Sequence, residues 1–125
     1  MIKYVLVFVG GGIGSMARLF VTSLVGKQIS TAFPWGTLAV NLLGALAIGL
    51  LIELMALKWS ISQDQRYLLI TGFIGGFTTF SAFSLETASM CVRGDWLMAM
   101  AYVLASVMGT VGLVILSTRL LRTLL

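Results

Sequence analysis

The few charged residues of this 125-residue sequence divide it into four long apolar runs. Only 10% of the residues are charged and 59% are hydrophobic, whereas about a quarter of a typical soluble domain is charged. Each run has the length of about 20 residues that an α-helix needs to cross a bilayer. We therefore expect an all-α membrane protein with a single domain over residues 1–125. Its four predicted transmembrane helices cover residues 4–25, 37–57, 67–92 and 96–118.

The aromatic residues agree with these boundaries. Amphipathic rings prefer the headgroup level of a membrane, and five of them fall at predicted helix edges: Tyr4, Trp35, Trp59, Tyr67 and Trp96. The remaining loops are too short for an extramembrane domain, so function must lie in the helix bundle. This composition excludes a soluble enzyme and a nucleic-acid binder. One Cys and no His also exclude a disulfide scaffold and a transition-metal site.

The basic residues favour one orientation in the membrane only weakly. The side that holds the second loop and both chain ends carries five of them: Lys3, Lys58, Arg66, Arg119 and Arg122. The other side carries Lys27 and Arg93, and Arg18 lies near it. The positive-inside rule favours cytoplasmic termini. The margin is small, so insertion in both orientations stays open.

The third predicted helix is the longest, and its centre reads GGFTTFSAFS over residues 75–84. Glycine costs a helix about 1 kcal/mol relative to alanine, and a glycine pair here adjoins four hydroxyl residues. Irregular backbone at membrane depth must be buried in protein or line a watery cavity, and its freed N–H and C=O groups can bind ions. We expect this helix to be broken mid-membrane. The alternative is that Gly72 and Gly76 only allow close helix packing.

Polar and aromatic residues recur at helical spacing around this segment. Phe80 and Phe83 share a face, where they either pack against lipid and protein or turn their positive ring edges toward an anion. Asn41 lies four residues after Thr37 and must be hydrogen-bonded, either as glue between helices or as a donor to an anion. The fourth predicted helix carries a hydroxyl stripe that is either a polar track or harmless self-bonding: Tyr102, Ser106 and Thr110.

Three charged residues lie within the predicted helices. Intramembrane ionisable residues are functional candidates by default. We expect Glu53 to reach the membrane interface and assign it no role. Arg18 either extends to the interface or gives a vestibule its positive potential, and Glu86 either stabilises backbone or pairs with Arg18.

Four sequence blocks combine these features. They are GGIGSMAR at 11–18, GTLAVNLLG at 36–44, TGFIGGFTTFSAFSLE at 71–86, and Tyr102 with Ser106. Together they resemble the Fluc/CrcB family of fluoride ion channels over all four predicted helices in order. The sequence departs from the family pattern at Ser15, Leu19 and Ala82, so no role is assigned to Ala82.

The resemblance implies a multi-pass protein of the bacterial inner membrane that exports fluoride passively. It further implies a dual-topology homodimer of two antiparallel copies with two pores. By similarity, the fluoride pore residues are Asn41, Phe80, Phe83, Tyr102, Ser106 and Thr110. Vestibule or structural residues are Arg18, Thr37, Thr79, Ser81, Ser84 and Glu86. Backbone carbonyls of Gly75 and Thr78 from both copies would hold a structural Na⁺ at the centre of the dimer.

Two other functions fit a membrane protein of this size. A small dual-topology multidrug exporter would need a glutamate in the middle of its first helix, where this chain has none. An accessory subunit without transport would use the hydroxyl stripes only as glue, and replacing Phe80 would then change stability but not flux.

Overall fold

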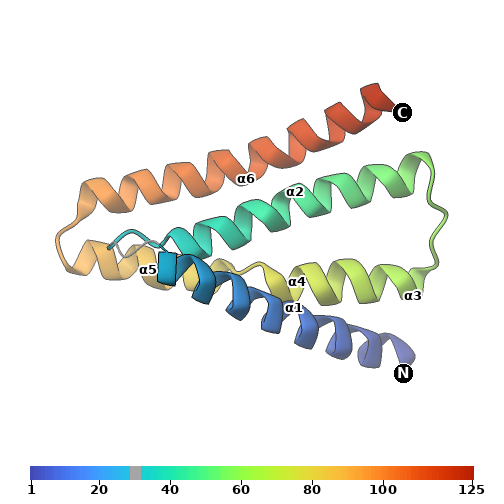
Figure 1. The fold of residues 1–125 in the computed structure, drawn as a ribbon, viewed down its shortest axis with the longest axis horizontal. Helices are drawn as coiled ribbons and strands as arrows, with labels where there is room; N and C mark the ends of the chain where they lie inside the picture. The colour runs from blue at the N-terminus through green and yellow to red at the C-terminus, as the bar shows by residue number, and fades with distance from the viewer. Residues whose placement is uncertain (29–31) are drawn as a thin grey trace.

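The computed structural model describes residues 1–28 and 32–125, and these form a helical bundle (Figure 1). The elements are α1 (Ile2–Gln28), α2 (Trp35–Leu57), α3 (Gln63–Arg66), the π-helix η1 (Tyr67–Ile74), α4 (Gly75–Phe77), α5 (Phe80–Val92) and α6 (Trp96–Leu124). The described residues contain four helical segments long and apolar enough to cross a membrane, the third running from Gln63 to Val92. The predicted all-α membrane protein with four transmembrane helices is confirmed.

The third transmembrane segment is interrupted, as its sequence predicts. It begins at a capping box, in which Ser62 Oγ accepts from the Gln65 N–H and the Gln65 side chain accepts from the Ser62 N–H. It continues through η1 and α4 and leaves the helix at Thr78 and Thr79, both of which have extended backbone. A new helix, α5, then starts at Phe80, where Thr79 Oγ1 accepts from the Ala82 N–H at 3.1 Å.

Glycines bring α1 into direct contact with this third segment. A Cβ atom at Gly14 would collide with the Phe73 carbonyl oxygen, and one at Gly76 would collide with the Gly11 carbonyl oxygen. In both places the helices meet backbone to backbone, which only glycine allows. Close packing and the helix break, which the sequence offers as alternatives, therefore coexist in this segment.

The long helices α2 and α6 lie side by side and point the same way (Figure 1). Their C-terminal ends, both chain termini and α3 gather at one end of the bundle. At the other end, α5 turns into α6 through Gly94, whose φ of +85° favours glycine. The interior is small, and Tyr102 and Val40 are fully buried within it. Most of the large apolar side chains face outward, as a lipid-exposed bundle requires.

Candidate functional site

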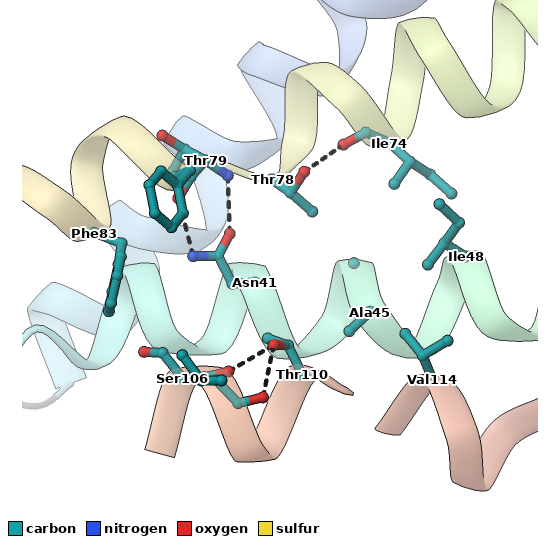
Figure 2. Close-up of a pocket in the computed structure, with 13 residues that line it drawn as sticks. Asn41, Ala45, Ile48, Ile74, Thr78, Thr79, Phe83, Ser106, Thr110 and Val114 are labelled. Carbon is teal, nitrogen blue, oxygen red and sulfur yellow. Dashed lines mark hydrogen bonds between the residues drawn. The ribbon is translucent and has the colours of Figure 1, made fainter. Parts of the chain in front are cut away.

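Asn41 on α2 holds the interrupted segment in place. Its Nδ2 donates to the Thr79 carbonyl oxygen at 3.0 Å, and its Oδ1 accepts from the Thr79 N–H at 2.8 Å (Figure 2). Thr79 is buried, so its backbone groups need these partners. A side-chain amide has two N–H donors, and this pairing uses one of them. Asn41 is therefore first a support for the break, with a second donor left for another partner.

The same contacts free two backbone carbonyls. In an uninterrupted α-helix the Thr79 N–H would donate to the Gly75 carbonyl, but it donates to Asn41 instead. The Ala82 N–H would similarly donate to the Thr78 carbonyl, but it donates to Thr79 Oγ1. The carbonyls of Gly75 and Thr78 thus lose their usual helical donors. Unwound carbonyls of this kind coordinate Na⁺ in membrane transporters.

A cavity of about 330 Å³ lies between α2, the break and α6 (Figure 2). Seven of the predicted site residues line it: Asn41, Thr78, Thr79, Phe80, Phe83, Ser106 and Thr110. Aliphatic residues complete the wall, and Ile48 and Val114 lie farthest toward the C-terminal ends of α2 and α6. None of the described residues that line this cavity is charged.

The hydroxyl stripe on α6 does not act as one unit. Thr110 Oγ1 donates to the Ser106 carbonyl oxygen of its own helix at 2.6 Å. Tyr102 lies outside the lining, and its phenol donates to Glu86 at 2.8 Å. Ser106 Oγ, in contrast, is buried without a hydrogen-bond partner among the described residues. A buried hydroxyl without a partner is costly, so Ser106 is the stripe residue best prepared to bind a ligand.

Aromatic rings form the wall near the break. The centroids of Phe80 and Phe83 lie 5.4 Å apart, and Phe83 is 5.1 Å from the ring of Tyr102. Phe83 is buried, but Phe80 is 78% exposed in the single chain. The two phenylalanines therefore share one side of the cavity, as their spacing predicts, and Phe80 also offers a free ring surface.

A second cavity, of about 370 Å³, also borders the break. Its lining includes Arg18, Thr22, Thr37 and Glu86, and Thr79 borders both cavities. A positive and a negative side chain therefore face this space, unlike the uncharged first cavity. The expected vestibule residues Arg18, Thr37 and Glu86 do gather here.

Glu86 is held by two neighbouring helices. Thr37 Oγ1 on α2 donates to Glu86 Oε1 at 2.7 Å, and the Tyr102 hydroxyl on α6 donates to Oε2 at 2.8 Å. The considered pairing with Arg18 does not form among the described residues, although both line the same cavity. Glu86 thus links three helices through hydrogen bonds.

Ser81 and Ser84 of α5, both expected as vestibule or structural residues, make only local contacts. Ser81 Oγ lies 3.2 Å from Thr79 Oγ1, next to the helix cap. Ser84 Oγ donates to the Phe80 carbonyl oxygen of its own helix at 3.0 Å. Both serines are exposed in the single chain and line neither cavity. The structure therefore brings only Ser81 to the break.

Glu53 has a partner that its place in the sequence does not reveal. Its residue is 3% exposed, and its carboxylate accepts hydrogen bonds from Arg122. Its expected position at the membrane interface stays a prediction. Treating α2 alone misses the partner, because Glu53 lies in its last two turns and Arg122 lies on α6. The signal that was missed is a basic residue at the same end of the fourth predicted helix, which runs parallel to α2.

Comparisons with known proteins give a consistent result. Residues 5–118 match the family model described as "CrcB-like protein, Camphor Resistance (CrcB)". A "Fluoride-specific ion channel FluC" of Chelativorans sp. (strain BNC1) is 48% identical over 125 residues, with 100% of both chains covered. A protein of the same name from Granulibacter bethesdensis is 47% identical over 100% of this chain and 98% of its own. One from Rhizobium johnstonii is 47% identical over 99% of each chain.

Proposed function

The chain belongs to the CrcB family, and we propose that it is a fluoride-selective ion channel of the bacterial inner membrane, not an enzyme. Passive export through this channel would lower the fluoride concentration inside the cell. The observation that carries the proposal is the uncharged cavity at the helix break, lined by Ser106, whose buried hydroxyl has no hydrogen-bond partner among the described residues.

The chemistry of this cavity suits a small, strongly hydrated anion. A selective pore must replace the water shell of its ion with protein groups, and it must still release the ion. Ser106 and the second N–H of Asn41 are neutral donors. The ring edges of Phe80 and Phe83 add partial positive charge. With no basic side chain in the lining, the anion is attracted without being trapped.

We also propose that two antiparallel copies assemble into a dimer with two pores. Phe80 lines the cavity but is 78% exposed, so the wall is incomplete in one copy. A second copy would cover this ring and enclose the cavity. Antiparallel pairing would create the inverted repeat that many transporters encode within a single chain. It also agrees with the weak difference in basic residues between the two sides of the membrane.

A structural Na⁺ at the centre of this dimer fits the freed carbonyls of Gly75 and Thr78. Among the described residues no group of His, Cys, Asp and Glu could hold a metal ion, so backbone oxygens are the suitable ligands. One copy supplies two such carbonyls, and an antiparallel pair would supply four. The cation would neutralise part of the carbonyl dipoles that the break exposes.

Fluoride flux is the decisive experiment. Purified protein in liposomes under an outward fluoride gradient should release fluoride far faster than liposomes without protein. Chloride, tested under the same gradient, should leave far more slowly. Fluoride release no faster than that from empty liposomes would overturn the proposal.

A phenylalanine substitution tests the ring-edge argument. Phe80→Ile should abolish or sharply reduce fluoride flux while the dimer persists on size-exclusion chromatography. Phe8→Ile is the matched control, because Phe8 is 81% exposed on α1 and lines neither cavity. If Phe80→Ile changed only stability, the chain would instead act as an accessory subunit.

Sodium dependence tests the central cation. A ligand that binds only the folded protein raises its melting temperature with concentration. The dimer should therefore unfold at a higher temperature in sodium chloride than in choline chloride of equal ionic strength. Equal melting temperatures over a wide sodium range would contradict the Na⁺ site and leave the channel proposal untouched.

A further inference from the structure

An ion pair between a buried Glu53 and an exposed Arg122 joins the C-terminal ends of α2 and α6. Arg122 Nε donates to Glu53 Oε1 at 2.7 Å, and Arg122 Nη2 donates to Glu53 Oε2 at 3.2 Å. The side chain of Glu53 is only 4% exposed, whereas that of Arg122 is 71% exposed. A carboxylate inside a membrane-spanning helix is expensive and usually serves a function. We call this pair the α2–α6 clamp.

The clamp continues the wall of the first cavity. Ile48 on α2 and Val114 on α6 line the cavity at its end nearest the clamp. One residue beyond Ile48, the helices touch: a Cβ atom at Gly49 would collide with Ser117 Oγ and lie 3.1 Å from the Val114 carbonyl oxygen. The Glu53 position follows Ile48 after a rise of about 7.5 Å along α2. Cavity, helix contact and clamp thus follow one another along a single seam.

We infer that the α2–α6 clamp is a positioning element for anion selection, an inference that rests on the proposed channel function. It fixes the separation of α2 and α6 at the aliphatic end of the first cavity. Chloride is larger than fluoride, so discrimination between the two depends on how closely the walls approach the ion. Opening the seam at the clamp would move the walls apart beside Ile48 and Val114 and weaken the discrimination against chloride.

Because Glu53 is buried and Arg122 is exposed, the inference predicts different effects from replacing each of them. Removing Arg122 leaves the buried Glu53 carboxylate without its cation, so it must either take up a proton or draw water between α2 and α6. Removing the charge of Glu53 leaves an exposed guanidinium that water already solvates, and a Gln there still accepts one hydrogen bond. Arg122→Gln should therefore be far more harmful than Glu53→Gln. The double variant carries no unpaired charge and should recover.

The experiment compares fluoride and chloride flux from liposomes that contain equal amounts of folded, full-length dimer. Arg122→Gln should lower the fluoride-over-chloride flux ratio by about tenfold, within the range for residues that act through packed helices. Glu53→Gln should change it by less than about twofold, and the double variant should return to within about threefold of wild type. Arg119→Gln is the control, because it removes the same charge one turn earlier from an exposed position.

Each outcome decides the inference. If Arg122→Gln lowers only the yield or the melting temperature and the folded channel keeps its flux ratio, the clamp is purely structural and the inference fails. An equal effect of Glu53→Gln and Arg122→Gln also overturns it. Should Arg122→Gln not fold, Arg122→Lys must show an intermediate ratio, and a wild-type ratio would refute the role. If the wild-type protein releases fluoride no faster than liposomes without protein, the channel proposal itself is refuted.

Discussion

Replacing Asn41 with alanine should release the backbone at the helix break. The substitution removes both hydrogen bonds to Thr79, whose N–H and carbonyl are buried. Each buried polar group left without a partner costs about 1–3 kcal/mol. Hydrogen bonds between transmembrane helices average nearer 0.6 kcal/mol, because the freed groups usually find other partners. At Thr79 such partners require the break to rearrange, so we expect a loss of about 3 kcal/mol for the two bonds together.

Amide hydrogen exchange at Thr79 measures this loss directly. A reduction of about 3 kcal/mol in the opening free energy corresponds to exchange more than about a hundredfold faster. Leu43→Ala is the control, because Leu43 is an exposed residue on the same helix. Fluoride flux should fall in the Asn41 variant and persist in the Leu43 variant.

The reasoning is refuted if exchange at Thr79 is unchanged in Asn41→Ala. Loss of flux with unchanged exchange would mean that Asn41 serves fluoride alone and that another contact holds the break. Faster exchange with normal flux would mean that the conformation of the break does not matter for conduction.

Three further substitutions follow from the contacts. Gly76→Ala should destabilise the protein by about 1–3 kcal/mol in chemical unfolding, because its Cβ meets the backbone of α1, whereas Gly26→Ala, with no atom within 4 Å, should not. Ser106→Ala should lower fluoride flux about tenfold without loss of stability, because the hydroxyl has no protein partner to lose. Tyr102→Phe should lower the unfolding free energy by about 1.5 kcal/mol, because Glu86 loses a donor while the ring contacts remain.

The sequence predicts the helices well because charge is so costly inside a membrane. Clusters of Lys, Arg, Asp and Glu can lie only near helix ends, so their positions mark the boundaries. The break is equally readable, because the Gly75–Gly76 pair and the following hydroxyl residues all oppose a continuous helix. Spacing gives the faces within each helix, and the family resemblance gives the grouping of Asn41, Phe83 and Ser106, which do line one cavity.

The partners of these side chains could not be predicted in the same way. The position of Asn41 inside the membrane requires that it be hydrogen-bonded, but the sequence does not say to which group, because Thr79 lies 38 residues away. The pairing of Glu53 with Arg122 spans 69 residues and depends on α2 and α6 being parallel neighbours. The partner of Glu53 was missed for that reason. A single helix considered alone cannot reveal the surface that a neighbour covers.

The π-helix η1 determines how the residues that follow it are oriented about the axis of the third segment. If residues 67–74 wound as an ordinary α-helix without losing a residue, each would turn by about 100° instead of the smaller angle of a π-helix, and everything after the segment would rotate by roughly one residue's turn. Thr79 would then turn away from Asn41, although no residue of the site had changed. The orientation of Thr79 toward Asn41 thus depends on how the helix winds a turn or more before it. Substitutions that convert this segment to α-helix at constant length should be far less tolerable than other changes in its apolar side chains.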